Sequence, residues 1–437
     1  MDFPTDTVES DRCSSPTKRG YLCGKTTVSR GLCVDAPEQC NERSDAKRTV
    51  PTSPVNLVGA KYAYVEDNLG SHCYYPEEKL IVDYEIQYED GEPVPENFSF
   101  LTYNIWGLAR NENLRHLFTL RKDLLERTLR GTNADIMCLQ EMSQYAFDQL
   151  TPFIDTYKFA SEKPYPAPGT KSTAERNRVV DAFVLSRYKP SRIAMYALPG
   201  VLNYNNCMCL VEYPNLVIFN LYNQAGSRLS PGQENKWIHY SRCRYDILQT
   251  IYDLVRTRYI AQNVIICGDF NFDLDGSVEA WPEIAMLDLL KQMGFVDTYR
   301  QLNAGEHGFT EDTDTNYMRW NKKLIEKHFR YDAILYKEAH PGSKHWTPRT
   351  SALIGTESLC LTPEESVLFL DTMSEAKGGR EAELRGCGQA PGGDLLIPIN
   401  PSDHFGVLST FVKSKAGGRR TRLRLKRVRR STRKRRV

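Results

Sequence analysis

Short apolar runs that end abruptly in polar side chains recur along the middle of this chain. In the clearest of them, residues 264–267 read Val-Ile-Ile-Cys, which predicts a strand covered on both faces, and Gly268 permits an unusual backbone turn at its end. Asp269 and Asn271 follow two positions apart, so in an extended chain they point to the same side. An ordinary turn rich in Asp and Asn explains this stretch at least as well on its own, so partners elsewhere must decide.

Hydrophobic periodicity predicts the other elements of a mixed fold. Strand-like runs occur at 98–103, 135–141, 179–185, 192–198, 207–213, 216–222, 329–336 and, after a polar turn, in 401–411. Helical spacing predicts one helix that ends at Gly131, one that begins at a Ser143 cap, one over 233–259 and one that ends at Gly294. Strands and helices in this order indicate an α/β or α+β fold with more than one sheet.

Changes in composition divide the chain into four regions. Residues 1–53 are polar and contain proline and cysteine, which predicts an irregular leader, and 54–95 form a strand-rich extension. The main domain is predicted at 96–412, with a surface insertion at 340–399 where the pattern is irregular and interrupted by Gly and Pro. Residues 413–437 are predicted to be a disordered basic tail.

Composition indicates a globular protein, because 41% of its 437 residues are hydrophobic and can form a large core. The sequence has no apolar run of about 18 residues, as a transmembrane helix would need, and its first residues are acidic and polar, unlike a signal peptide. We therefore expect a soluble, intracellular protein.

Eight of the twelve cysteines form two groups of four that differ in their surroundings. Four lie in apolar strand-like runs, where a reduced cysteine behaves as a small hydrophobe: Cys138, Cys207, Cys209 and Cys267. Four others lie in the polar leader without the tight Cys-x2-Cys pairs of common zinc sites: Cys13, Cys23, Cys33 and Cys40. Buried thiols are the simpler account of the first group, and zinc is disfavoured for the second.

The net charge of +2 hides a strong asymmetry between the two ends of the chain. Residues 413–437 carry 14 Lys and Arg and no acid, which leaves 57 − 14 = 43 basic against 55 acidic residues in 1–412, a net of −12. Nucleic-acid binding is the first interpretation of such a tail, because neutralising phosphates releases counterions and gives salt-sensitive affinity. A nuclear import signal and attraction to anionic lipid are the alternatives.

Five predicted strand ends present polar groups, and one further strand contains a carboxylate. Each has a simple explanation as a turn or cap. Together they supply one histidine and several oxygen atoms that could bind a hard divalent cation. The strand ends carry Asn104, Glu141, Tyr222 with Asn223, Asp269 with Asn271, and Asp403 with His404, and Asp332 lies within 329–336.

Five motifs in this order resemble the series found in the endonuclease/exonuclease/phosphatase superfamily, whose folds resemble deoxyribonuclease I. The motifs are Asn-Ile-Trp-Gly-Leu at 104–108, Leu-Gln-Glu at 139–141, Gly-Asp-Phe-Asn at 268–271, Tyr-Asp-Ala-Ile-Leu at 331–335 and Ser-Asp-His at 402–404. The similarity runs from about residue 98 to 411, and it implies a four-layer αββα sandwich of two mixed β-sheets with the site at the sheet edges.

The resemblance also implies roles for individual residues, with Mg²⁺, or alternatively Mn²⁺, as the cofactor. Glu141 would be the main metal ligand, with Asn104 beside it and Asp403 near the metal. A phosphodiester is anionic and resists attack by hydroxide, so charge neutralisation by a metal suits this chemistry.

The remaining residues would supply the catalytic groups. His404 would be the general base, oriented and made more basic by Asp332, because histidine titrates near neutral pH. Asp269 and Asn271 would position the attacking water and the phosphate oxygens. Where many members carry a histidine in the middle strand motif, this chain has Tyr222, so a donor to the transition state at that place would be a tyrosine hydroxyl.

Two other departures bear on the substrate. Trp106 occupies the place where abasic-site nucleases have an additional acid, and the Asn-x-Trp-Gly form is similar to neutral sphingomyelinases. Asp273 stands where the inositol polyphosphate 5-phosphatases usually place arginine, which argues against a polyphosphorylated headgroup. The sequence therefore favours a Mg²⁺-dependent phosphodiesterase acting on nucleic acid, with a sphingomyelinase-like enzyme and a catalytically inactive binding protein as alternatives.

Overall fold

The computed structural model describes residues 81–109, 111–161, 179–180, 182–197, 207–226, 237–276, 283–318, 327–339, 346–374, 387 and 396–413. It also describes the two-residue strands β1 (Tyr21–Leu22) and β2 (Tyr62–Ala63), which pair in parallel. The rest of the leader 1–53 with its four cysteines, most of the extension 54–95 and the tail beyond 413 lie outside these residues.

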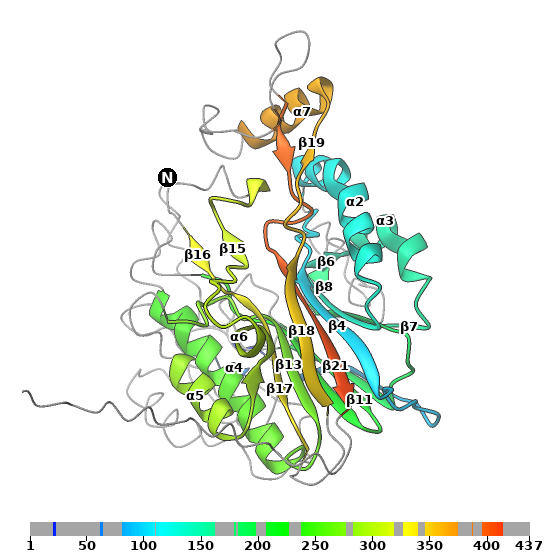
Figure 1. The fold of residues 1–437 in the computed structure, drawn as a ribbon, viewed down its shortest axis with the longest axis vertical. Coiled ribbons are helices and arrows are strands. Elements are labelled where there is room, and N and C mark those ends of the chain that lie inside the picture. The colour runs from blue at the N-terminus through cyan, green and yellow to red at the C-terminus, as the bar shows by residue number, and fades with distance from the viewer. Residues whose placement is uncertain are drawn as a thin grey trace, which may run out of the picture.

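Two mixed β-sheets form the centre of the described structure (Figure 1). The seven-stranded sheet has the order β14 (Val296–Asp297), β17 (Asp332–Lys337), β13 (Val264–Asp269), β12 (Leu216–Tyr222), β11 (Cys207–Tyr213), β10 (Arg192–Ala197) and β3 (Ile81–Gln87). The six-stranded sheet has the order β18 (Trp346–Ile354), β21 (Gly406–Lys413), β4 (Asn97–Asn104), β5 (Ile136–Gln140), β9 (Phe183–Ser186) and β7 (Phe159–Ala160). Each sheet contains one parallel pair, β12 with β13 and β4 with β5.

Helices cover the outer face of each sheet, so the domain has four layers (Figure 1). α2 (Glu112–Thr132) and α3 (Gln144–Ile154) share an apolar core with the six-stranded sheet, and α4 (Trp237–Thr257) and α5 (Glu283–Gln292) share another with the seven-stranded sheet. A third core fills the space between the sheets and includes Phe98, Ile136, Ile218 and Ile265. The predicted four-layer sandwich of two mixed sheets is confirmed.

Smaller elements connect these layers. They are the helices α6 (Thr298–Leu302) and α7 (Pro363–Ser374) and the short strand pairs β6 (Met142–Ser143) with β8 (Val179–Val180), β15 (Glu311–Asp312) with β16 (His328–Phe329), and β19 (Leu359–Cys360) with β20 (Pro398–Ile399). Among the described helices, none is both long and apolar enough to cross a membrane.

The ends of the two helices on the six-stranded sheet follow local capping chemistry. Ser143 caps α3 as predicted, because its hydroxyl accepts a hydrogen bond from the Ala146 N–H. The prediction that Gly131 ends the preceding helix is wrong. α2 continues through Gly131 to Thr132, and Asn133 ends it in the left-handed conformation with φ 48°, a role that asparagine shares with glycine.

Two edge strands come from regions that the sequence separated from the main domain. β3 lies in the predicted extension 54–95 and pairs with β10, and β18 lies in the predicted insertion 340–399 and pairs with β21. The description of 346–354 as irregular is therefore wrong. An edge strand needs apolar residues on one face only and tolerates proline, so Pro348 and the exposed Arg349 hid the pattern.

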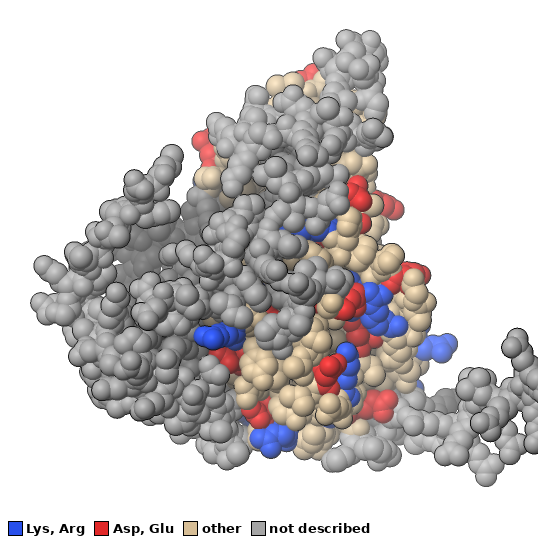
Figure 2. Space-filling view, turned by 90° about the vertical axis from the view of Figure 1, so that its left-hand side faces the viewer, with Lys and Arg blue, Asp and Glu red and all other residues tan. Residues whose placement is uncertain are grey.

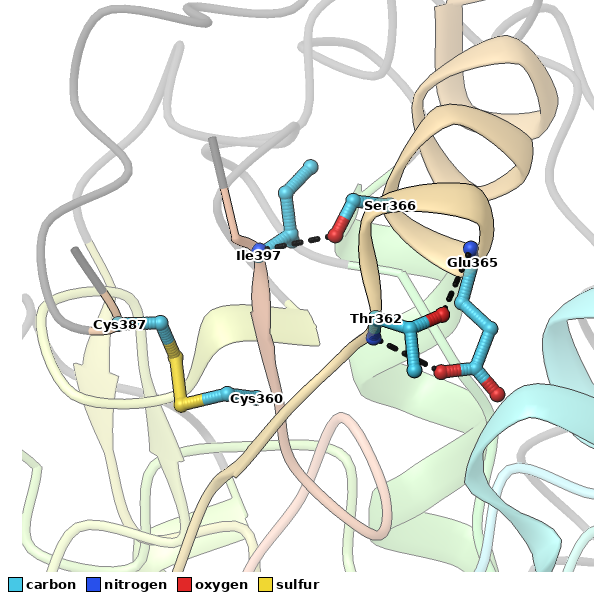
Figure 3. The surroundings of a disulfide bond; sticks show 6 residues. All are labelled: Cys360, Thr362, Glu365, Ser366, Cys387 and Ile397. Atoms are coloured by element: carbon cyan, nitrogen blue, oxygen red, sulfur yellow. Dashed lines mark hydrogen bonds between the residues drawn. A yellow bond between two sulfur atoms is a disulfide. The ribbon is translucent and has the colours of Figure 1, made fainter. Parts of the chain in front are cut away.

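A second described part of the predicted insertion, residues 359–374, 387 and 396–399, packs against α2 through a shared apolar cluster. Within it, Cys360 and Cys387 form a disulfide that the sequence analysis did not predict (Figure 3). Figure 3 also shows a reciprocal cap at the start of α7, where the Glu365 N–H donates to the Thr362 hydroxyl and the Thr362 N–H donates to the Glu365 carboxylate. The predicted buried thiols are confirmed for Cys138, Cys209 and Cys267, whereas Cys207 is half-buried.

We expect Gly268→Ala to destabilise the fold and Gly131→Ala to stabilise it. Gly268 has φ 129°, and a Cβ there would lie 1.9 Å from the Leu221 carbonyl oxygen, so alanine should lower the free energy of unfolding by roughly 3 kcal/mol. Nothing lies within 4 Å of a Cβ at the helical Gly131, so alanine should add roughly 0.5–1 kcal/mol. Urea unfolding followed by circular dichroism measures both, and equal effects would contradict the backbone argument.

Candidate active site

The carboxyl ends of the two parallel strand pairs meet at one place between the sheets. Asn104 ends β4, Glu141 follows β5, and Tyr222 and Asp269 end β12 and β13. Asn104 Nδ2 donates to Asp269 Oδ2 at 3.1 Å and to Glu141 Oε1 at 3.3 Å. The Tyr222 hydroxyl donates to the same Glu141 oxygen at 2.8 Å. Four predicted site residues, two from each sheet, therefore form one hydrogen-bonded group.

Glu141 has the environment of a cation ligand. Its side chain is buried, its backbone is left-handed with φ 58°, and its Oε2 has no hydrogen-bond partner among the described residues. Burial raises the pKa of the Glu141 carboxyl, and the charge on Asp403 raises it further. A buried carboxylate oxygen without a donor fits a hard divalent cation, because such ions prefer oxygen ligands.

The Asn104 side chain bridges two carboxylates through its amide hydrogens, and its oxygen is already hydrogen-bonded to the backbone. Its Oδ1 accepts the Trp106 N–H at 3.0 Å, so its amide hydrogens face Glu141 and Asp269. The Ser402 hydroxyl donates to the Asn104 carbonyl oxygen at 2.7 Å and so joins the end of β4 to the loop before β21.

His404 and Asp332 form a buried pair beside this group. His404 Nδ1 lies 2.8 Å from Asp332 Oδ2, and β17 runs antiparallel to β13 so that Asp332 pairs with Asp269. Burial lowers the pKa of His404, but the charges on Asp332 and Asp269 outweigh it and raise this pKa to about 10. The ligand atoms of these three residues all lie within 4.8 Å of one another.

Asp269 and Asn271 occupy the turn that follows β13. The Asn271 N–H donates to Asp269 Oδ1 at 2.8 Å, and Asn271 Nδ2 donates to the Asn223 carbonyl oxygen at 3.0 Å. Asn271 is left-handed with φ 55°, which aims its side chain differently from that of an extended residue. Burial raises the pKa of Asp269 to about 8, although His404 opposes that shift. The eight predicted site residues thus lie together at one edge of the sandwich.

Two residues that the sequence analysis used for the substrate are structural instead. Trp106 is 9% exposed and packs with Leu117 of α2 and Phe369 of α7. Asp273 is buried, and its Oδ1 accepts the N–H groups of Asp275 and Arg330, so it holds the loop rather than facing a ligand. The Asp273 argument against a polyphosphorylated substrate therefore does not hold.

Two supporting residues were missed. Thr310 accepts the Asp332 N–H with its hydroxyl, at 3.0 Å, and no sequence pattern indicated this. Arg121 lies in the middle of α2 and is buried. A signal for it was present, because a charge at this position interrupts the apolar stripe that runs from Leu117 to Leu125.

The sequence model of the Endonuclease/Exonuclease/phosphatase family matches residues 101–404, and the chain belongs to this family. The matched segment begins in β4 and ends at His404, so it contains all eight predicted site residues. A search of curated proteins finds no match.

Solved structures of low sequence identity are similar to this chain. Truncated Caenorhabditis elegans TDP2 is 16% identical, covering 72% of this chain and 97% of that chain, with a TM-score of 0.45. D. rerio TDP2 complexed with a single-strand DNA product is 18% identical, covering 72% and 99%, with a TM-score of 0.46. Sphingomyelinase C from Streptomyces griseocarneus is 13% identical, covering 72% and 99%, with a TM-score of 0.46.

We expect Asp269→Asn to change how stability depends on pH in the presence of a chelator. Because burial raises the pKa of Asp269 from 3.8 to about 8, its contribution to stability is full below about pH 4 and is lost as the pH rises through 8. The unfolding temperature of the unaltered protein should therefore fall relative to that of D269N between about pH 5 and pH 9.

Asp275→Asn is the matched control for this measurement. Although burial opposes it, pairing with Arg300 and Arg330 lowers the pKa of Asp275, so both its folded and unfolded values lie below about pH 5. The difference between the unaltered protein and D275N should stay constant over the same range. A constant difference for D269N as well would contradict the buried-carboxylate account.

Proposed function

We propose that this chain is a Mg²⁺-dependent phosphodiester hydrolase that acts on nucleic acid. One observation carries the proposal, namely that a buried Glu141 oxygen without a donor lies in the same site as the His404–Asp332 pair. Glu141 would be the main metal ligand with Asn104 beside it, where the Asn104 amide bridges Glu141 and Asp269, and Asp403 would lie near the ion. Mg²⁺ or Mn²⁺ bound there would supply neutralisation of phosphate charge.

The protein's own groups would handle the attacking water. With Nδ1 of His404 held by Asp332, Nε2 is the ring nitrogen that would exchange the proton. The charge on Asp269 raises the pKa of His404 and the charge on His404 lowers that of Asp269, so the protonation of each group depends on the other. Neutral His404 would accept the proton of the attacking water at Nε2, with Nδ1 held by Asp332 and the water positioned by Asp269, and the imidazolium that forms would then attract the phosphate.

Asn271 and Tyr222 would complete the phosphate contacts. The Asn271 amide uses one hydrogen on Asn223, and its left-handed backbone holds it next to Asp269, so it would donate to a phosphate oxygen. The Tyr222 hydroxyl, which now donates to Glu141, would be the donor on the side of the seven-stranded sheet. Neutral donors suit this place because the site already holds several carboxylates.

Charge distribution supports nucleic acid as the substrate. On the face shown in Figure 2, described acidic and basic side chains are interspersed, whereas residues 413–437 hold 14 Lys and Arg without an acid. The lipid alternative rested on the Asn-x-Trp-Gly motif and on the absence of the additional acid that abasic-site nucleases carry at the place of Trp106. Because the Trp106 ring packs in the core beside α7, that motif is explained by packing without a lipid contact.

His404→Ala and Glu141→Gln should each reduce kcat by roughly 10²–10⁴-fold, since each removes a group that acts on the reacting phosphate. E141Q should also weaken Mg²⁺ binding, whereas H404A should retain it. His116→Ala, an exposed histidine on α2, is the control and should match the unaltered protein.

Activity is measured on abasic duplex, single-stranded DNA, RNA, sphingomyelin and inositol phosphates, with Mg²⁺ and with chelator. Turnover at the unaltered rate in the presence of chelator or in H404A would refute the mechanism. Preference for sphingomyelin would favour the lipid alternative, and no turnover on any substrate would favour an inactive member of the fold.

A chain ending at Lys415 should bind nucleic acid more weakly and with a shallower salt dependence. It loses 12 of the 14 basic residues of 413–437, because only Lys413 and Lys415 remain. Each lost phosphate contact removes about 0.9 from the slope of log affinity against log salt, so affinity at low salt should fall about tenfold or more. A full-length tail with Gln in place of Lys and Arg separates charge from length. Identical affinities would remove the tail from the proposal.

A further inference from the structure

Arg121 is a buried cation whose hydrogen bonds go to the main chain. It is 1% exposed in the middle of α2. Its Nη1 donates to the Ile105 carbonyl oxygen at 2.8 Å and to the Pro401 carbonyl oxygen, and its Nη2 donates to the Trp106 carbonyl oxygen. Burying a charged guanidinium costs free energy, and a carboxylate partner usually offsets that cost. Arg121 instead bonds three carbonyls, which indicates a specific structural role.

The three carbonyls belong to two loops beside the candidate metal site, one directly after Asn104 and one that carries Asp403, whereas Glu141 follows β5. Ile105 and Trp106 directly follow Asn104, and Trp106 has a left-handed backbone with φ 46°. Pro401 directly precedes Ser402, whose hydroxyl bonds the Asn104 carbonyl oxygen, and Asp403 comes next. One side chain thus joins the loop after β4 to the loop before β21.

Two aromatic rings lie against this guanidinium. Its carbon lies 5.2 Å from the centre of the Trp106 ring and 5.0 Å from that of Phe118. Its positive charge also attracts the buried carboxylates of Glu141 and Asp403. A lysine would keep the charge, but a single ammonium cannot hold three carbonyls of two loops in the fixed geometry of a planar fork.

We propose that Arg121 is a positioning residue that clamps the loop after β4 to the loop before β21, and so holds Asp403 at the spacing from Glu141 that a divalent cation needs. This inference rests on the proposed hydrolase function for its kinetic consequence. The clamp itself is a property of the chain without metal.

The test compares Arg121→Lys and Arg121→Met with Arg192→Met. Arg192 is also a largely buried arginine, paired with Glu85 and Glu212. It lies at the end of β10 and β11 remote from Tyr222, since Glu212 pairs with Val217 and Tyr222 pairs with Cys207. Loss of Arg192 should therefore lower stability without touching the site.

Three readouts separate positioning from general support of the fold. Hydrogen exchange without metal should be faster in R121K at 105–109 and 400–405, with exchange in β12 unchanged. Calorimetry should give about tenfold weaker Mg²⁺ binding. At saturating substrate, kcat should fall more than KM changes. R121M should show larger effects of the same kind, and R192M should show only a lower unfolding temperature.

The proposal is overturned if R121K exchanges in both loops at the rate of the unaltered protein. It is equally overturned if exchange is faster while Mg²⁺ affinity and kcat are unchanged, since the clamp would then serve the fold alone. If R121M does not fold, R121K decides. If the unaltered protein hydrolyses no substrate, the proposed function fails, while exchange and Mg²⁺ affinity still decide the role of Arg121.

Discussion

Buried negative charge is the constraint on which the rest of this structure depends. Four carboxylates from both sheets, Glu141, Asp269, Asp332 and Asp403, are buried at one edge of the sandwich. Burial raises the pKa values of Glu141 and Asp269, and repulsion from neighbouring carboxylates raises them further. His404 and Arg121 are buried cations that offset this charge, and a bound divalent ion would offset it further. Substituting one of these groups therefore alters the ionisation of the others.

The sheet topology brings these charged residues to one edge of the sandwich. Each sheet has one parallel pair, and the carboxyl ends of those pairs deliver Asn104, Glu141, Tyr222 and Asp269. Antiparallel neighbours then bring residues at the starts of strands to the same edge, which is how Asp332 and His404 arrive there. Of the four described non-glycine residues with positive φ, Glu141 and Asn271 belong to the site and Trp106 lies two residues after Asn104, so backbone strain is concentrated around the site.

Much of the fold and of the grouping of the site followed from sequence, because buried strands and the polar residues that end them leave a strong pattern. Asp269 and Asn271 were ambiguous alone and became informative through their partners. The parts that escaped depend on contacts distant in sequence. β18 was not predicted because an edge strand tolerates a proline such as Pro348. The Cys360–Cys387 disulfide was not predicted because no cysteine spacing indicates it. The role of Arg121 was not predicted because a charged residue on a helix usually faces water. Trp106 resembled a substrate residue, yet its ring belongs to the core.

The pairing of β4 with β21 has a consequence for biosynthesis. Thr102 pairs with Val407, 305 residues later (407 − 102), so β4 lacks this neighbour until the end of the sandwich has been translated. At roughly 5–20 residues per second, that interval is on the order of 15–60 s. The Ser402–Asn104 bond and the His404–Asp332 pair cannot form before then. A nascent chain therefore carries an incomplete candidate site until β21 has been translated.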